Sequence, residues 1–278
     1  MSPSIRLEQL ACMNMMYRQY SLEYFLSTAQ RIGYCAATFW AGPPHFILDG
    51  AGYEDVKALR RRFAAHGIRC TSFITPALLP PNQVAIEGAE HIEDTYRYFC
   101  NGVRVAEDMG ASVMSINSGY GLRTHSRDDA WKRSCEMLRR LAAFASEHGV
   151  TITMESMRAP ECNLAYNLQE VQRILAEVAH PGLKAMVDTG AMNIAGETVW
   201  DWFAAFGSEI VNTHFVDAVG SAHLAWGDGR LPLDDILRCL AQYGYTGPLG
   251  LEVGGAQYES NPAAADERMF RNLLRYVG

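Results

Sequence analysis

The sequence predicts an α/β protein of the TIM-barrel class, a single (β/α)8 domain over residues 1–278. Short apolar segments alternate with helical patterns eight times along the chain, and no Pro- or Ser-rich linker interrupts them. Four of these segments end in an acidic residue or a histidine. Such ends meet at one place only if the strands are parallel, which favours a closed barrel over the alternative, a doubly wound open sheet. The first strand also lacks the G-x-G-x-x-G turn of dinucleotide-binding sheets.

The first half of the chain contains four units of a strand followed by a helix. Short apolar runs predict strands at residues 9–16, 36–40, 68–75 and 111–117. Apolar residues at helical spacing predict helices at residues 22–32, 53–66, 92–109 and 128–148. Glycines follow all four of these helices, at positions 33, 67, 110 and 149, and glycine is a typical helix end.

The second half repeats this alternation. We expect strands at residues 151–154, 183–187, 210–213 and 249–251. The helices between and after them are expected at residues 168–178, 198–206, 233–243 and 266–277. The two halves together supply the eight units that a barrel needs.

The composition indicates a globular protein without a nucleic-acid or membrane partner. Hydrophobic residues make up 49% and charged residues 20%, the net charge is -7, and the longest basic run is Arg60-Arg61-Arg62. The chain shows no secretion signal and no apolar stretch of membrane-spanning length. Its seven cysteines are scattered without a C-x-x-C pair, which favours a reducing, cytoplasmic location.

Four polar residues close four separate apolar strands: Glu155, Asp188, His214 and Glu252. Any one of them is equally consistent with a surface loop or a structural ion pair, but four together at matching strand ends predict a metal site. Burying an unpaired charge is costly, so these groups need a partner. Three carboxylates and one imidazole suit Mn²⁺ or Mg²⁺ and tolerate Co²⁺ or Zn²⁺. We therefore expect one divalent ion, Mn²⁺ first, with two positions open for adjacent sugar oxygens.

The order strand-Glu, strand-Asp, strand-His, strand-Glu resembles the xylose-isomerase-like superfamily of sugar isomerases and epimerases over nearly the whole chain. Within it, the sequence is most similar to ketose 3-epimerases, the D-tagatose 3-epimerase and fructoselysine 3-epimerase group. Local patterns carry this resemblance: Glu155 with Glu161 and Asn163, Met186-Val-Asp188, His214-Phe-Val-Asp217, Trp226-Gly-Asp-Gly-Arg-Leu-Pro-Leu233 and Trp40-Ala-Gly-Pro-Pro-His45.

The resemblance implies an isomerase of carbohydrate metabolism that epimerises C3 of a free or substituted ketose through a metal-bound enediolate. It implies that Glu155 and Glu252 act as acid and base on opposite faces of the sugar while also binding the metal. Glu161 is expected to hydrogen-bond a sugar hydroxyl and to hold Glu155 in place. Further substrate contacts are expected from four residues: Trp40, His45, Asn117 and His223.

Two positions depart from the tagatose-type pattern. Ala191 replaces a histidine three residues after the sixth-strand aspartate, and Gly220 replaces an arginine six residues after the seventh-strand histidine. These sugar contacts must be missing or come from other residues such as His223, so a substituted ketose is a candidate substrate. The extra histidines of the three-metal AP endonucleases in the same superfamily are absent as well, which favours one metal ion.

Three functions of different classes therefore stay open. The first is an epimerase or isomerase, the second a lyase or dehydratase acting on a keto-sugar or keto-inositol, including C-glycoside cleavage, and the third a non-catalytic sugar-binding barrel. Intact Glu155 and Glu252 favour the two enzymes over the binding protein. A homo-oligomer, such as the dimers common among relatives, is also expected. The sugar and its phosphorylation state stay open.

Overall fold

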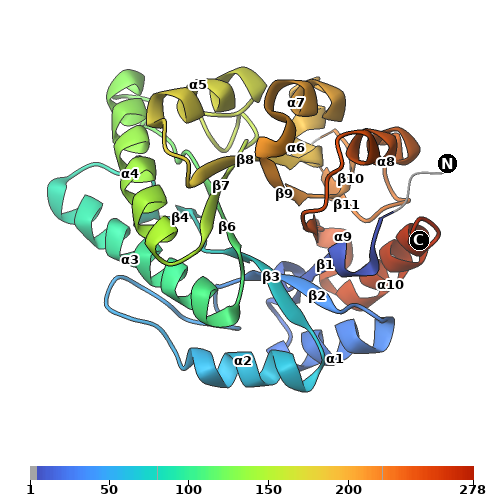
Figure 1. Ribbon diagram of the computed structural model, residues 1–278. Coiled ribbons are helices and arrows are strands. Elements are labelled where there is room, and N and C mark those ends of the chain that lie inside the picture. The colour runs from blue at the N-terminus through green and yellow to red at the C-terminus, as the bar shows by residue number, and fades with distance from the viewer. Residues whose placement is uncertain (1–4, 80, 221) are drawn as a thin grey trace.

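The computed structural model describes residues 5–79, 81–220 and 222–278 of the chain. Eight parallel strands form a closed barrel in the spatial order β1-β12-β9-β8-β7-β6-β3-β2, and helices surround it (Figure 1). The strands follow the order of the chain around the barrel, and β12 closes it against β1. The predicted (β/α)8 barrel is confirmed.

The barrel strands lie close to the predicted segments. They are β1 (Leu10–Met13), β2 (Ala36–Trp40), β3 (Arg69–Ile74), β6 (Val113–Asn117), β7 (Thr151–Glu155), β8 (Leu183–Asp188), β9 (Ile210–His214) and β12 (Leu249–Leu251). Their register brings neighbouring strand ends level, because Asn117 pairs with Glu155 and Asp188 with His214. The side chains at these carboxyl ends therefore share one rim of the barrel.

Ten α-helices lie in the described residues. They are α1 (Leu22–Ile32), α2 (Val56–Ala65), α3 (Ala89–Met109), α4 (Arg127–Glu147), α5 (Leu168–Val178), α6 (Thr189–Ile194), α7 (Val199–Phe206), α8 (Leu233–Gln242), α9 (Ala256–Glu259) and α10 (Pro262–Leu274). Polar side chains begin several of them; Ser126, for example, accepts the backbone N–H of Asp129. Gly33 ends α1 with φ 112°, a left-handed conformation that favours glycine.

The first strand is shorter than predicted. It ends at Met13, and Asn14 leads into a 3-10 turn over Met15–Tyr17 in place of the strand expected to residue 16. The amide of Asn14 explains this end. Its Oδ1 accepts the backbone N–H of Trp40 at 2.8 Å and its Nδ2 donates to the carbonyl of Trp40 at 2.9 Å. A side chain therefore takes over the bonding between β1 and β2, which hydrophobic periodicity does not reveal.

Other elements were not predicted from the apolar pattern. Two small hairpins project from the barrel rim, β4 (Leu78–Leu79) with β5 (Asn82–Gln83) and β10 (Asp217–Val219) with β11 (Ala222–Leu224). The short helix α6 follows β8 directly. The last helix also begins earlier than expected, at Pro262, because Asn261 caps it and proline suits a first helical position.

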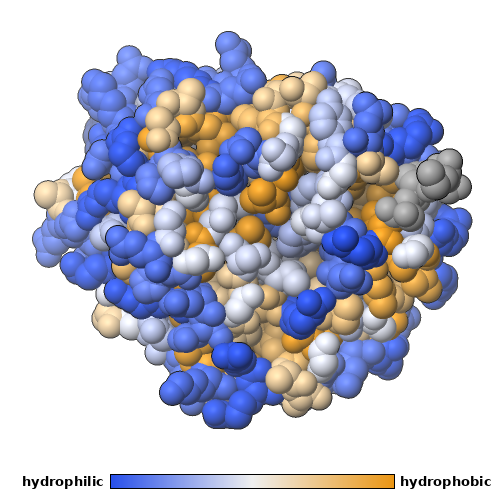
Figure 2. All heavy atoms as spheres, in the orientation of Figure 1, coloured by the Kyte–Doolittle hydropathy of each residue, from blue (hydrophilic) through white to orange (hydrophobic). Residues whose placement is uncertain are grey.

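Apolar side chains fill the space between the barrel and the surrounding helices. The rings of Phe39 (β2) and Phe63 (α2), for example, meet edge to face with centroids 5.3 Å apart. Figure 2 shows hydrophilic residues gathered towards the periphery of one face, with neutral and apolar residues towards its middle. No helix in the described parts of the chain is long and apolar enough to cross a bilayer. The seven cysteines are all free, in agreement with their scattered spacing.

A buried carboxyl group joins the last helix to the beginning of the barrel. Asp266 of α10 is 5% exposed, and its Oδ2 accepts a hydrogen bond from the Tyr17 hydroxyl at 2.5 Å. Burial raises the pKa of Asp266 from 3.8 to about 7, against the opposing effect of the Tyr17 hydrogen bond. Between these two values the folded protein holds a proton that the unfolded chain releases. The contribution of Asp266 to stability therefore falls as the pH rises through this window.

We expect Asp266→Asn to remove this pH dependence while keeping an oxygen for Tyr17. From about pH 4 to about pH 8 the free energy of unfolding of the variant should rise relative to the parent, by on the order of 4 kcal/mol at most, since one pKa unit corresponds to about 1.4 kcal/mol. Urea unfolding of both proteins at several pH values across this range measures the difference. A difference that does not vary with pH would contradict a buried, protonated Asp266.

Candidate metal centre

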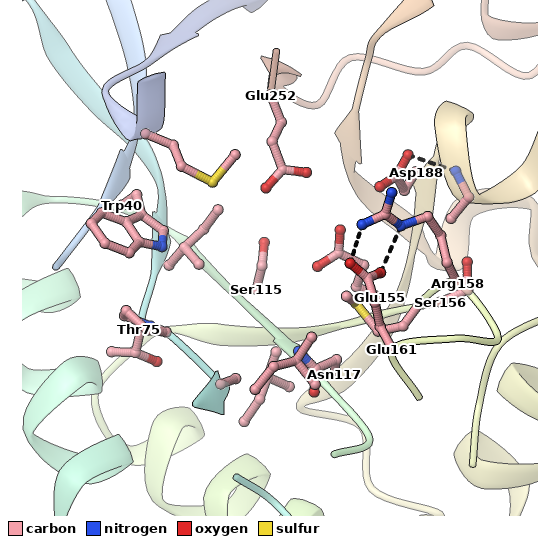
Figure 3. A pocket seen from close by; sticks show the side chains of 18 of the residues that line it. Trp40, Thr75, Ser115, Asn117, Glu155, Ser156, Arg158, Glu161, Asp188 and Glu252 are labelled. Atoms are coloured by element: carbon pink, nitrogen blue, oxygen red, sulfur yellow. Dashed lines mark hydrogen bonds and ion pairs between the residues drawn. The ribbon is translucent and has the colours of Figure 1, made fainter. Parts of the chain in front are cut away.

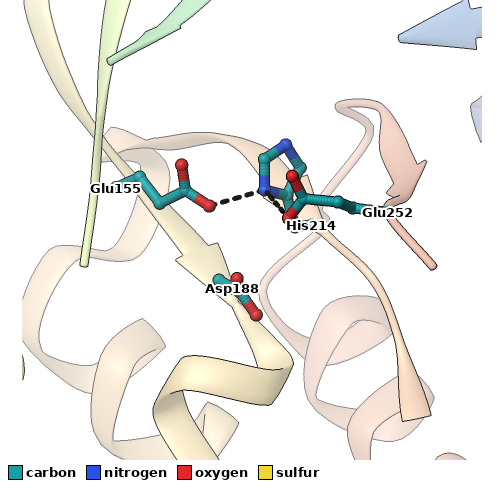
Figure 4. Close-up of side chains that lie close together, drawn as sticks. All are labelled: Glu155, Asp188, His214 and Glu252. Carbon is teal, nitrogen blue, oxygen red and sulfur yellow. Dashed lines mark hydrogen bonds and ion pairs between the residues drawn. The ribbon is translucent and has the colours of Figure 1, made fainter. Parts of the chain in front are cut away.

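Four side chains converge at the carboxyl-terminal rim of the barrel. Glu155 ends β7, Asp188 ends β8, His214 ends β9 and Glu252 directly follows β12. Each offers one ligand atom, and these atoms all lie within 4.8 Å of one another. The structure thus brings together the four residues that the sequence predicts as metal ligands, which Figure 4 shows pointing toward a common point.

The imidazole of His214 lies between the two glutamates. Its Nδ1 is 2.6 Å from Oε1 of Glu155 and 2.9 Å from Oε2 of Glu252 (Figure 4). Asp188 is held separately, because its Oδ1 accepts the backbone N–H groups of Gly190 at 2.7 Å and Ala191 at 3.0 Å and so caps α6. The second oxygen of Asp188, Oδ2, is left to face His223 at 3.2 Å.

The charges of this cluster fit a bound cation. Burial raises the pKa of Glu155 to about 7, and the neighbouring carboxylates of Glu252 and Asp188 add to the rise against the effect of His214. Although burial alone would lower it, the pKa of His214 is raised well above its usual value by Glu155 and Glu252. Crowded carboxylates thus recruit a positive charge, which a divalent ion would supply in place of the imidazole proton. Three carboxylates and one imidazole are also a donor set that such ions bind.

A pocket of about 250 Å³ opens beside these residues. Trp40, Asn117, Glu161 and His223, four of the predicted substrate contacts, lie in its lining, and Figure 3 shows the first three among its side chains. One wall is polar and holds the carboxylates. The opposite wall is mainly apolar and includes residues 74–78, which lead from β3 into the β4–β5 hairpin. The site can therefore place a polar molecule against the carboxylates and shield it on the other side.

Asn117 has an amide with a defined orientation. Its Oδ1 accepts the backbone N–H of Gly119 at 2.9 Å. The amide group at Nδ2 is therefore the part of Asn117 that can donate to a molecule in the pocket. Since Asn117 pairs in register with Glu155, this donor lies at the level of the candidate ligands.

The sequence matches the model of the xylose isomerase-like TIM barrel family over residues 26–273. The chain belongs to this family. A fructoselysine 3-epimerase from Escherichia coli O157:H7 is 27% identical to it over 249 residues, 85% of this chain and 87% of the relative. A D-psicose 3-epimerase from Ruminiclostridium cellulolyticum is 29% identical over 130 residues, 47% of this chain and 43% of that protein.

A solved structure has the same fold. The D-psicose 3-epimerase from Clostridium cellulolyticum H10, determined with D-tagatose, superposes with a TM-score of 0.74 over 100% of this chain and 99% of that one, at 18% identity. These relatives are named epimerases, which are isomerases. The resemblance to ketose 3-epimerases that the sequence indicates, and with it the isomerase class, is confirmed.

Glu161 lies in the pocket of this xylose isomerase-like barrel but has a partner that the sequence did not predict. Its Oε2 accepts from Nε of Arg158 at 2.7 Å, and its Oε1 contacts the same guanidinium group (Figure 3). Among the described contacts, Glu161 pairs with Arg158 and not with Glu155, which it was expected to hold. The three-residue spacing between Arg158 and Glu161 was the signal in the sequence that could have indicated this ion pair.

The structure corrects the prediction that His45 contacts the substrate. His45 is 5% exposed and is not in the described lining of the pocket. Its Nδ1 lies 2.8 Å from Nδ2 of Asn14 and its Nε2 lies 2.9 Å from the carbonyl oxygen of Tyr20. The loop after Trp40 therefore turns His45 inward, where both ring nitrogens have partners within the protein.

Asp217, the last residue of the His214-Phe-Val-Asp217 pattern, holds a loop near the site. Its carboxylate accepts the backbone N–H groups of Gly227 at 3.1 Å, Gly229 at 2.8 Å and Leu231 at 2.9 Å. These bonds fasten the loop that leads into α8. The sequence did not indicate that the backbone N–H groups of this glycine-rich loop would all donate to the carboxylate of Asp217.

We expect His45→Ala to destabilise the protein without weakening metal binding. The substitution removes the His45 partner of the Asn14 amide nitrogen and of the Tyr20 carbonyl, which should lower the free energy of unfolding by about 1–3 kcal/mol. Urea unfolding measures the loss, and Mn²⁺ titration of the folded variant serves as the control. Weaker Mn²⁺ binding with unchanged stability would contradict this and would indicate that His45 contributes to the metal site.

Asp188→Asn tests the ligand assignment with little disturbance of the fold. The asparagine keeps an oxygen to cap α6, but its NH₂ group replaces Oδ2 and cannot bind a cation. Loss of a residue that only hydrogen-bonds a metal ligand typically lowers metal affinity by roughly 10–100-fold. Because Asp188 would be a ligand itself, we expect the affinity for Mn²⁺ to fall by more than this. Isothermal titration of Mn²⁺ measures this. The exposed Asp108, replaced by Asn, is the matched control, and equal affinities in both variants would exclude Asp188 as a ligand.

Proposed function

We propose that this protein is a metal-dependent sugar epimerase that inverts C3 of a free or substituted ketose. One observation carries the proposal: the carboxylates of Glu155 and Glu252 reach the same point from β7 and β12, with His214 Nδ1 2.6 Å and 2.9 Å from them. Two carboxylates that meet from separate strands can stand on the two faces of one sugar carbon. Inversion of a carbon centre requires this arrangement, because a proton leaves one face and another arrives on the opposite face.

The names of the relatives support a ketose as the substrate class and C3 as the reacting carbon. The fructoselysine 3-epimerase matches most of the chain and acts, by its name, on a substituted ketose. The D-psicose 3-epimerase points to the same carbon. Ala191, which lines the pocket where tagatose-type enzymes carry a histidine, argues for a substrate other than tagatose or psicose.

We infer that the ion is Mn²⁺, held by Glu155, Asp188, His214 and Glu252. When bound, it supplies positive charge that makes a proton next to a carbonyl group more acidic. The donor set supports an oxygen-preferring ion first, with Mg²⁺, Co²⁺ or Zn²⁺ as possible substitutes.

The two glutamates perform the proton transfers. One carboxylate oxygen takes the proton from C3, the C3–H electron pair forms the double bond of an enediolate, and the carbonyl oxygen takes up the negative charge. The other glutamate then gives a proton to C3 from the opposite face, and the carbonyl group reforms. The reverse reaction uses the same residues in exchanged roles, so neither oxidant nor reductant is consumed.

The pocket residues orient the sugar for these transfers. Nδ2 of Asn117 can donate to a sugar oxygen, since Oδ1 is held by Gly119. Trp40 offers a ring edge and face, and its own position is fixed because Asn14 bonds both its backbone N–H and its carbonyl group. The apolar wall opposite the carboxylates limits access of water to the enediolate.

A reaction in D₂O tests the function directly. The protein is incubated with Mn²⁺ and a panel of ketoses that includes fructoselysine, and the products are followed by NMR. Deuterium at C3 with an intact carbon skeleton supports the epimerase. Release of water or an aglycone would show a lyase, and the absence of any exchange would show a sugar-binding protein.

Glu252→Gln should abolish deuterium exchange at C3 while the protein still binds Mn²⁺, since an amide oxygen can remain a ligand but an amide cannot accept the proton. We expect a loss of at least about 100-fold in the exchange rate, the usual lower size of a general-base contribution. Exchange is read by NMR and Mn²⁺ binding by titration. Unchanged turnover would remove Glu252 from catalysis.

A further inference from the structure

A second imidazole lies against the candidate metal centre. His223 belongs to β11, which pairs antiparallel with β10 opposite Ala218. Its Nε2 is 3.2 Å from Oδ2 of Asp188, and its Nδ1 is 3.5 Å from Oε2 of Glu252. One ring therefore contacts two of the four candidate ligands. These two come from β8 and β12, which β9 separates in the barrel, so no strand pairing links them directly.

The β10–β11 hairpin is fixed to the barrel by bonds that do not involve the imidazole. The backbone N–H of Gly254, two residues after Glu252, donates to the carbonyl of His223 at 2.9 Å. The ring of Trp226 packs on Phe215 with centroids 4.7 Å apart, and its Nε1 donates to the Phe215 carbonyl at 3.1 Å. The backbone therefore carries His223 to the site independently of its contacts with Asp188 and Glu252.

Gly190 provides the space that the ring occupies. A Cβ atom at this position would lie 2.4 Å from Cδ2 and 2.6 Å from Nε2 of His223, closer than side-chain atoms can pack. The backbone of Gly190 lies outside the left-handed region, so its conformation does not require glycine. It also lies in the first turn of α6, a helix that alanine would favour by up to about 1 kcal/mol relative to glycine. The contact with His223 accounts for a glycine there.

Both ring nitrogens of His223 lie close to carboxylates, and Nε2 is buried without a hydrogen bond among the described residues. An imidazole in this position can hold Oδ2 of Asp188 and Oε2 of Glu252 at a fixed separation, while Oδ1 of Asp188 is already held by the start of α6. Partners of this kind orient ligating carboxylates and raise metal affinity, and their loss typically costs about 10–100-fold in affinity.

We propose that His223 is a positioning residue of the metal centre, which orients the Asp188 and Glu252 carboxylates for the ion, and that the lack of a side chain at Gly190 makes room for its ring. The proposal rests on the metal centre of the proposed function but not on epimerisation. It gives the hairpin a role in metal binding in addition to the sugar contact that the sequence suggested for His223, which also lines the pocket.

Isothermal titration of Mn²⁺ into the full-length protein tests this. The variants are His223→Ala, Gly190→Ala and the double substitution, with the exposed His91→Ala on α3 as the matched control. We expect affinity to fall about 10–100-fold in His223→Ala and to fall similarly in Gly190→Ala, whose methyl group displaces the ring. The double variant should lose less affinity than the sum of the two single losses, because the closest contacts of a methyl group at Gly190 are with the His223 ring.

Two further readouts separate positioning from a general structural effect. His223→Gln, which keeps a donor near the carboxylates, should recover part of the affinity, and the electron paramagnetic resonance spectrum of bound Mn²⁺ should differ between His223→Ala and the parent. Circular dichroism confirms that each variant is folded. Unchanged Mn²⁺ affinity in His223→Ala would overturn the proposal, as would additive losses in the double variant. A parent protein that does not bind Mn²⁺ would contradict the metal centre itself. If the variants change Mn²⁺ affinity as expected but the protein epimerises no ketose, the positioning role stands and the proposed function fails.

Discussion

The structure depends on holding three carboxylates and one imidazole together at a largely buried rim. Like charges at these separations repel one another, and burial strengthens the repulsion because little water is present to screen it. Glu155 responds with a pKa raised to about 7 and His214 with a raised pKa of its own. A cation is the partner that relieves this repulsion most directly. The electrostatic repulsion among these buried carboxylates therefore destabilises the rim of the barrel, and a bound divalent ion would reduce this repulsion.

The barrel supplies the rigidity that such a cluster needs. Each candidate ligand stands at or just beyond the carboxyl end of a strand, where ladder bonds to neighbours fix its backbone, as Asp188 pairs with His214. Local bonds then fix the side chains, since Asp188 caps α6 and His223 reaches over from the β10–β11 hairpin. The hairpins and loops around the rim can change between relatives without moving the ligands, which is how one fold serves different sugars.

The fold and the four converging side chains could be predicted from the sequence because both follow from repeated, local signals. Short β-branched runs and helical periodicity mark the eight units, and a charged residue closing an apolar strand has few structural explanations. The β10–β11 hairpin could not be predicted in this way. Its strands are only three residues long, and the bonds from Asp217 that hold the following loop depend on backbone N–H groups brought together by the fold.

The errors at the substrate side have the same physical origin. Trp40 and His45 belong to one loop, and the resemblance of Trp40-Ala-Gly-Pro-Pro-His45 to a loop of the family suggested that both face the pocket. Whether a loop side chain points outward depends on partners from elsewhere, and Asn14 and Tyr20 provide them for His45. Arg158 was missed although its ion pair with Glu161 is local, because a three-residue spacing in a loop does not by itself indicate that the two side chains meet.

A layer of hydrogen-bonded polar side chains lies inside the barrel, next to the metal centre along β9. Asn212 lies two residues before His214 on β9, so both side chains point into the barrel. Its Nδ2 donates to Ser115 Oγ at 2.8 Å and lies 3.1 Å from Ser72 Oγ, which joins β9 to β6 and β3 across the interior. Barrel interiors are more often filled by branched apolar residues, which fix no orientation by hydrogen bonding. The hydrogen bonds of Asn212 therefore help to fix the rotation of β9, the strand from which His214 reaches the two glutamates.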